Sequence, residues 1–134
     1  MTLAPELVDR LADAVRDLPE LSWLALHGSR ARGEAHDHSD WDFAFLARAP
    51  VDPLDLMDRL ARALHDNVEV DVVDVDRASA VLRINVASEG LLIWERAPGQ
   101  FDDFREQASR FWCDAASVIE RAQAQMLAAL GPST

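Results

Sequence analysis

A glycine-serine turn follows one apolar segment of this chain, and two aspartates precede the next. Residues 21–26 and 43–47 are short and rich in apolar side chains, which predicts two buried strands. Gly28 and Ser29 follow the first strand, and Asp40 and Asp42 precede the second. In an extended chain alternate side chains share a face, so the two carboxylates point the same way. Carboxylates this close repel each other, and a divalent cation relieves the repulsion. The pattern therefore predicts a metal site at one end of a sheet.

The remaining periodicities predict helices and strands in alternation. Residues 5–18 place apolar side chains on one helical stripe, and residues 53–64 do the same behind an N-cap at Asp52. Residues 68–75, rich in valine, and residues 91–95 predict two further strands. Residues 81–89 are ambiguous, because their apolar side chains also alternate with a period of two. The order of elements predicts a single domain over residues 1–134, an α/β fold with a sheet of about four to five strands flanked by helices.

A helix of roughly 30 residues is predicted after Pro98 and Gly99, and Gly131 ends it. Its apolar positions recur at spacings of three and four, from Phe101 to Ala129. The ordinary interpretation of such a stripe is packing against the sheet and first helix of the same domain. A helix this long can also extend past the body of a short chain. The surplus is then a candidate surface for a homo-oligomer or a hetero-oligomer.

The charge balance limits the partners of the chain. With 24 acidic and 13 basic side chains the formal net charge is -11, which repels a phosphate backbone and argues against nucleic-acid binding. A basic protein partner is attracted instead. The single cysteine, Cys113, can form no internal disulfide, which is typical of a reducing compartment. No signal peptide and no apolar run of about 18 residues are visible, so we expect a cytoplasmic protein without membrane contact.

The segment from the turn to the aspartates resembles a known signature. Gly28 and Ser29, followed by ten residues and an Asp-x-Asp pair, are similar to the motif of the polymerase-beta-type nucleotidyltransferase superfamily. Residues 31–35 and Ser39 resemble its small bacterial branch, the minimal nucleotidyltransferases (MNT), which act as antitoxins beside HEPN-domain toxins. The resemblance implies a nucleotidyltransferase-like mixed sheet and a helix over residues 81–89. It also implies transfer of AMP from ATP to a hydroxyl, expected to be that of a tyrosine, on a cognate HEPN-type toxin, which neutralises the toxin.

Such a reaction depends on charge neutralisation around a triphosphate, which two Mg2+ ions held by about three carboxylates supply. Asp40 and Asp42 are the first two predicted ligands. Asp71 is the third, because it lies between two valines in mid-strand, where a carboxylate without a cation is costly to bury. The resemblance indicates the same residue. Its expected role is to complete one metal site and to accept the proton of the acceptor hydroxyl. Asp74 is the competing candidate, although it also suits the end of the strand.

The turn supplies candidates for binding the triphosphate of ATP. Gly28 lets the backbone approach the nucleotide closely, and the hydroxyl and N–H of Ser29 can donate to phosphate oxygens. The guanidinium of Arg32 can pair with the phosphates, whereas Arg30 is a weaker candidate. The resemblance adds Ser39 to the nucleotide-binding residues.

Three alternatives remain open. The chain can be an antitoxin that neutralises its partner by binding alone, or a nucleotidyltransferase for a small molecule such as an aminoglycoside. Its 134 residues leave no room for a separate acceptor-binding domain, which favours an acceptor presented by another protein. The third alternative is a zinc hydrolase, because His36, His38 and Asp40 alternate as in metallo-beta-lactamases. Trp41 stands where that motif has a further histidine. Trp41 and His27 also depart from the nucleotidyltransferase pattern.

Overall fold

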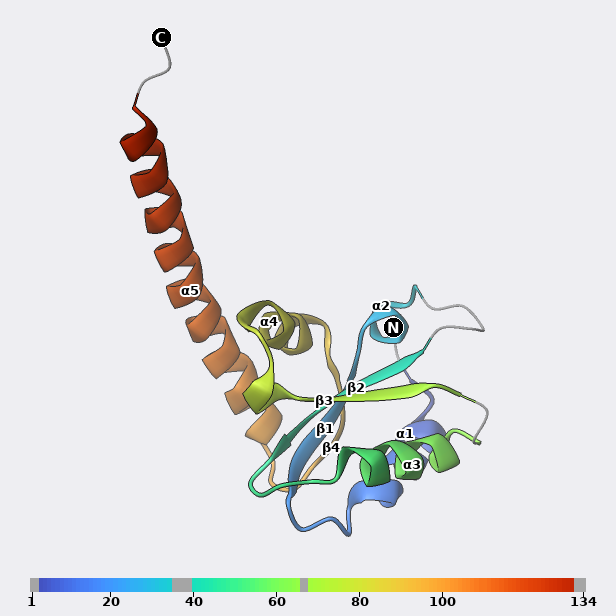
Figure 1. Cartoon of the computed structure of the whole chain (residues 1–134). Helices are drawn as coiled ribbons and strands as arrows, with labels where there is room; N and C mark the ends of the chain where they lie inside the picture. Colours follow the sequence, from blue (N-terminus) through green and yellow to red (C-terminus); the bar gives the residue numbers. More distant parts are fainter. Residues whose placement is uncertain (1–2, 35–39, 66–67, 132–134) are drawn as a thin grey trace.

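The computed structural model describes residues 3–34, 40–65 and 68–131, which form a four-stranded sheet with helices on both faces (Figure 1). The strands are β1 (Leu21–His27), β2 (Trp41–Ala47), β3 (Val70–Asp74) and β4 (Leu91–Glu95), in the order β3-β2-β1-β4. Strand β1 pairs antiparallel with β2 and β4, and β3 runs parallel to β2. The sheet is therefore mixed, and the predicted α/β fold is confirmed.

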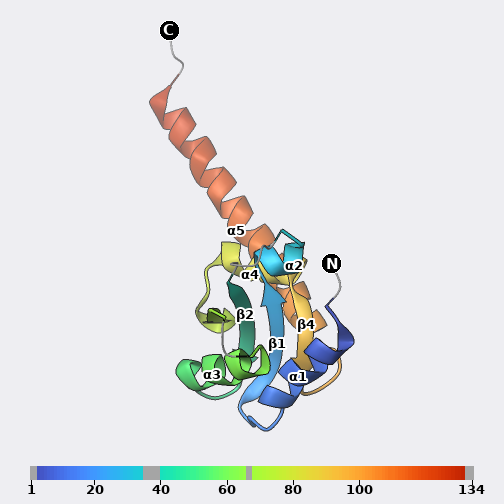
Figure 2. The same ribbon diagram turned by 90° about the vertical axis from the view of Figure 1, so that its right-hand side faces the viewer.

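Helices α1 (Pro5–Val15) and α3 (Pro53–Ala63) cover one face of the sheet (Figure 2). Helix α3 begins as predicted, because the Asp52 carboxylate accepts a hydrogen bond of 3.0 Å from the N–H of Leu54 and a proline opens the first turn. The apolar side chains of the two helices and of the strands beneath them form one core cluster. It includes Leu11, Val15, Leu24, Leu26, Phe43, Leu56 and Leu60.

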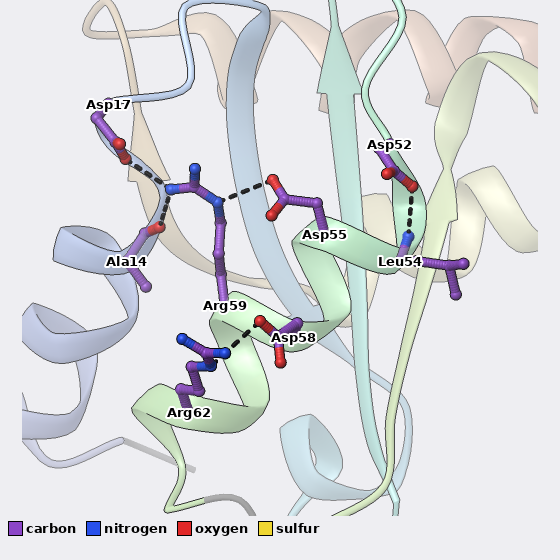
Figure 3. Close-up of polar contacts among 8 residues, drawn as sticks. All are labelled: Ala14, Asp17, Asp52, Leu54, Asp55, Asp58, Arg59 and Arg62. Carbon is purple, nitrogen blue, oxygen red and sulfur yellow. Dashed lines mark hydrogen bonds and ion pairs between the residues drawn. The ribbon is translucent and has the colours of Figure 1, made fainter.

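Arg59 of α3 joins the two helices on this face (Figure 3). Its Nη1 donates to the carbonyl oxygen of Ala14 at 3.1 Å and to Asp17 Oδ1 at 2.9 Å. Its Nε donates to Asp55 Oδ2 at 3.0 Å within α3. Ala14 lies in the last turn of α1, where carbonyl groups lack an intrahelical donor. Arg59 therefore satisfies the end of one helix while fixing it to the other.

The opposite face carries α4 (Ala80–Glu89) and the first part of α5 (Gln100–Leu130) (Figure 2). The Ser79 hydroxyl caps α4 at 3.2 Å, so residues 81–89 are helical, as the resemblance implied. Trp23 of β1 is fully buried on this face, with its ring centroid 4.8 Å from those of Phe101 and Phe104. Helix α5 thus packs on its own sheet as expected, but on the α4 side and not on the face of the first helix.

Beyond Ala108, α5 projects away from the sheet (Figure 1). Phe101, Phe104 and Ala108 are the buried residues of this helix, and most side chains from Phe111 to Leu130 are exposed. The helix therefore has the surplus length that its stripe allowed. Within the described ranges, no helix is both long and apolar enough to span a membrane.

Two short elements go beyond the elements expected from the sequence. Helix α2 (Ser29–Arg32) is a single turn directly after Gly28, and η1 (Val75–Arg77) is a 3-10 turn that ends β3. The predicted strand over residues 68–75 is shorter because the Asp74 carboxylate accepts a hydrogen bond of 3.0 Å from the N–H of Asp76 and starts the turn. Elements of three or four residues are too short to show a period of their own.

Candidate active site

Three polar residues form a row across neighbouring strands at one end of the sheet. His27 of β1 is the register partner of Asp42 in β2, and Asp42 is the register partner of Asp71 in β3. Residues directly opposite each other in a sheet share a face, so the three side chains lie on one face. Two residues further along, Ala25 and Ala44 of the same strands belong to the core under α4 and α5. The row therefore opens on the α4 face, just beyond the edge of this core.

Gly28 brings the turn after β1 into contact with the middle of the row. Its backbone has φ 76° and ψ -158°, a conformation that side chains disfavour. A Cβ atom built on Gly28 would lie 2.6 Å from Asp42 Oδ2, closer than real contacts allow. The structure thus gives a reason for this glycine that the sequence did not indicate, which is the close approach of the turn to the Asp42 carboxylate. Its approach to a nucleotide stays a prediction.

Asp42 is the acid of the row whose pKa is raised. Burial raises the pKa of its carboxyl group, and the charges of Asp71 and Asp40 raise it further, while His27 and Arg32 oppose the shift. The pKa of the His27 imidazole is lowered by burial, which the charge of Asp42 opposes. Unlike Asp42, Asp40 is exposed and immediately precedes β2. The carboxylate row is thus a cluster of like charges that a cation would stabilise.

The carboxylates of the site lie on neighbouring strands, but those that the structure describes do not form a complete metal site. In the part of the chain that the structure describes, no three histidine, cysteine or acidic side chains come together closely enough to coordinate one metal. The donor set still fits Mg2+, a hard cation that binds through one or two protein carboxylates and keeps its remaining positions for water and phosphate oxygens. Asp40, Asp42 and Asp71 as metal ligands therefore stay a prediction, supported by the neighbouring positions of Asp42 and Asp71.

Arg32 lies at the edge of the row and contacts two carboxylates. Its Nε donates to Glu34 Oε2 and its Nη1 donates to Glu89 Oε2, both at 3.1 Å. Glu89 is the last residue of α4, so this ion pair joins the turn to the helix on the same face. The charge of Arg32 also acts on Asp42. The guanidinium predicted to bind phosphate is therefore close to the row, in contact with acids that a triphosphate must compete with.

Trp41 and Asp42 are neighbours in β2, and their side chains lie on opposite faces of the sheet. Trp41 packs with the core under α1 and α3, and the guanidinium of Arg30 lies 4.3 Å from the centroid of its ring. The bulk of Trp41 is thus on the face opposite to Asp42, which explains how a tryptophan fits between two acids. Arg30 is held on that ring, in agreement with its weaker candidacy. Ser39, like the histidine pair at positions 36 and 38, lies outside the described residues.

Asp74, the competing third ligand, does not belong to the row. It pairs with Phe45 near the other end of β2 and β3, and its carboxylate caps η1. A hollow lined by Phe45, Val51 and Asp74 lies at this far end of the strands, away from Asp42. Asp71 is therefore the better placed of the two candidates.

Two members of the site were not assigned from the sequence. His27 was noted as a departure from a motif, but its position beside Asp42 depends on the register of two strands. Glu89 reaches Arg32 across 57 positions of sequence. Neither contact has a local signal, because both depend on long-range pairing and packing.

Two aspartates lie opposite each other on neighbouring strands of a mixed sheet, and a glycine turn approaches one of them. This fold and site define a domain of the nucleotidyltransferase type. Residues 9–98 match the family described as Polymerase beta, Nucleotidyltransferase, which is more than half of the chain. The chain belongs to this family, as the sequence motif indicated.

Two curated relatives are named protein adenylyltransferase MntA. The protein from Shewanella oneidensis is 36% identical over 90 residues, which cover 64% of this chain and 63% of the relative. The protein from Aphanizomenon flos-aquae is 28% identical over 101 residues, which cover 67% of each chain. The chain thus matches less than two thirds of the length of the Shewanella protein.

Solved structures extend the likeness over nearly the whole chain. A chain of a toxin-antitoxin crystal structure with AMP-PNP superposes with a TM-score of 0.74 at 27% identity, covering 90% of this chain and 98% of that one. A chain of the complex between the tri-AMPylated Shewanella oneidensis HEPN toxin and its MNT antitoxin has a TM-score of 0.56 at 29% identity, with 92% of each chain covered. Nine tenths of the chain therefore have a counterpart in these structures.

Proposed function

We propose that this chain is an antitoxin adenylyltransferase, which transfers AMP from ATP to a tyrosine hydroxyl of a HEPN-type toxin and so neutralises it. The observation that carries the proposal is the pairing of Asp42 with Asp71 in register, next to a turn that touches Asp42. The names of the relatives support the reaction type. The toxin-antitoxin structures, one with an ATP analogue and one with an AMPylated toxin, support the nucleotide and the acceptor.

Asp40, Asp42 and Asp71 would hold Mg2+, with two ions as the expected number. A related toxin-antitoxin structure with a TM-score of 0.73 is a mutant with two Asp→Glu substitutions that have one residue between them, the same spacing as Asp40 and Asp42. Bound Mg2+ would neutralise the triphosphate and favour charge development on the phosphate oxygens. The acids of the site repel each other in the free protein, because their charges are alike. The same negative charges would attract and hold the cation.

The other residues of the site bind and orient the nucleotide. The N–H groups and hydroxyl of the turn, at Gly28 and Ser29, donate to the triphosphate, together with Ser39. Arg32 adds a positive charge once a phosphate competes with its carboxylate partners. In the transfer, the acceptor hydroxyl oxygen bonds to the α-phosphorus, and the bond from that phosphorus to the bridging oxygen of pyrophosphate breaks. The proton of the hydroxyl passes to the carboxylate of Asp71.

The acceptor must come from another protein. The chain contains no tyrosine, so a tyrosyl product cannot arise on the chain itself. The net charge of -11 attracts a basic partner and repels nucleic acid. A HEPN-type toxin that presents its tyrosine to the row meets the first condition.

Intact-mass analysis of the co-purified toxin tests this function. With ATP and Mg2+, we expect the toxin to gain mass in steps of one AMP. The Asp42→Asn variant should lose this gain, because a neutral amide replaces an anionic ligand of nearly the same shape. The Asp74→Asn variant is the matched control, because asparagine can still cap η1. If both variants and the wild type protect cells equally and the toxin never gains mass, the chain is an antitoxin that acts by binding alone.

A further inference from the structure

We propose that the distal part of α5, residues 111–130, pairs antiparallel with the same segment of a second copy of this chain. The inference is independent of the transferase reaction, because this segment contains no residue of the row. It rests on the exposure of one helix face, on the distribution of charge along the chain and on a pair of opposite charges beside that face.

The exposed face continues the face that packs on the sheet. Phe101, Phe104 and Ala108 are buried at spacings of three and four, and the same spacing continues through Phe111 and Ala115. From there the stripe follows Val118, Ile119, Ala122 and Met126. The exposed fractions are 52% for Phe111, 59% for Val118, 51% for Ile119 and 66% for Met126. An apolar face that is core in its first turns therefore lies uncovered for the following five turns.

This segment carries a low net charge. Residues 111–130 contain two acids, Asp114 and Glu120, and one base, Arg121, so their net charge is -1. The total of -11 leaves -10 on the rest of the chain. A second copy that approaches along this segment therefore meets little like charge.

The same charges select the direction of pairing. Twenty helical residues span about 30 Å, whereas the Debye length at physiological salt is about 8 Å. Antiparallel helices place the two acidic bodies toward opposite ends of the paired segment, where salt screens their repulsion. Parallel helices would bring the bodies side by side. Repulsion between the bodies therefore disfavours the parallel arrangement.

Two charges beside the stripe complement those of a second copy. Asp114 and Arg121 are seven residues apart, so they lie on the same flank of the apolar face. In an antiparallel pair centred between residues 116 and 117, Ala115 lies opposite Val118 and Ala122 lies opposite Phe111, so that small side chains meet large ones. On the flank of this pair, Asp114 of each copy lies within two residues of the level of Arg121 of the other copy, a separation that the long arginine side chain can span. The surface is thus complementary to itself in both charge and volume.

Helices that pair over a few turns form a small interface, near or below the roughly 1,200 Å2 at the lower end for specific complexes, so we expect a weak dimer that forms over the micromolar range. Sedimentation of the full chain alone, from about 1 to 200 µM, tests this estimate. We expect the mass to rise from the monomer value of 14.9 kDa toward twice that value. No ATP and no toxin are needed, so the result is separate from the test of the reaction.

Substitutions on the two sides of α5 make the test specific. Val118→Asp places a charge on the stripe and should shift dimerisation to at least tenfold higher concentration. Ala124→Asp adds the same charge on the exposed opposite side and should leave the dimer nearly unchanged. Asp114→Arg should weaken the dimer, and the double variant Asp114→Arg, Arg121→Asp should restore it. Circular dichroism should show that each variant is folded, because these side chains contribute nothing to the core.

A chain that stays monomeric at 200 µM overturns the proposal, as does an equal effect of Val118→Asp and Ala124→Asp. A double charge variant that stays as weak as Asp114→Arg alone overturns the antiparallel arrangement. If the chain alone is monomeric and Val118→Asp abolishes toxin binding, the toxin is the occupant of this face and the second copy is not. A dimer that forms while the toxin gains no mass leaves this inference standing and removes the transferase function.

Discussion

Replacing Gly28 with alanine would test whether the turn after β1 sets the position of the Asp42 carboxylate. The new Cβ would lie 2.6 Å from Asp42 Oδ2 and 3.3 Å from Asp42 Cβ. Both atoms belong to a short side chain on a paired strand, so relief requires a new Asp42 rotamer or a shift of the turn. A new rotamer moves the carboxylate relative to Asp71, and a shift of the turn moves the turn away from the carboxylate. We therefore expect Gly28→Ala to damage the site as well as the stability of the fold.

The magnitude follows from the backbone and the contact together. The φ of 76° and ψ of -158° at Gly28 belong to a region that is nearly exclusive to glycine. Forcing alanine into it costs about 1–3 kcal/mol, or a fall in melting temperature of roughly 4–12 °C for a domain of this size. The displacement of Asp42 adds a loss of nucleotide binding, which the backbone strain alone would not cause.

Thermal unfolding with and without ATP and Mg2+ separates the two effects. Gly99→Ala is the control, because Gly99 also has a positive φ, 91°, but no atom lies within 4 Å of its added Cβ. Both variants should melt below the wild type. The stabilisation by ATP and Mg2+ should persist in Gly99→Ala and be lost in Gly28→Ala. A Gly28→Ala variant that keeps the full response to ATP would refute the argument that the turn positions Asp42.

Three further outcomes follow from the contacts described. Because the pKa of Asp42 is raised above its ordinary 3.8, its stabilising contribution is complete below that value and is lost as the pH rises through the folded-state pKa. In EDTA, Asp42→Asn should therefore gain stability over the wild type between pH 3.5 and 7 in urea unfolding, and a constant difference would contradict the shift. Asp71→Asn should abolish AMP transfer in the intact-mass assay while Asp74→Asn retains it, and the reverse result would exchange the two assignments. Arg59→Met should lower the free energy of unfolding by about 1–2 kcal/mol, because it removes a cap shared by two helices. Arg62→Met, which removes one exposed ion pair within α3, should have little effect, and equal losses would show that the link between helices is unimportant.

The sequence predicted the elements that have their own periodicity or caps. Strands and long helices show their burial as repeats of two or three to four residues, and Asp52 marks the start of α3 by a contact only two residues away. The choice of Asp71 over Asp74 also followed from local surroundings; the pairing of Asp71 with Asp42 supports it, and it stays a prediction. The resemblance was needed for residues 81–89, since their alternation fits a strand as well as a helix.

Other parts of the site could not be predicted, because they depend on pairing between distant segments. The position of His27 next to Asp42 requires the register of β1 against β2. The contact of Arg32 with Glu89 requires the packing of α4 on the sheet. The close approach of Gly28 to the Asp42 carboxylate also depends on how β1 and β2 pair, which the sequence around the glycine does not contain.

The row across three strands has a consequence for how such chains can change in length. His27, Asp42 and Asp71 share a face because each stands opposite the next in the ladder. Deleting or inserting one residue within β2 would turn Asp42 to the other face and break the row, even though every residue type is still present. An insertion between two strands leaves the ladder and the row intact. Homologous chains should therefore differ in length between these strands and keep a constant spacing within them.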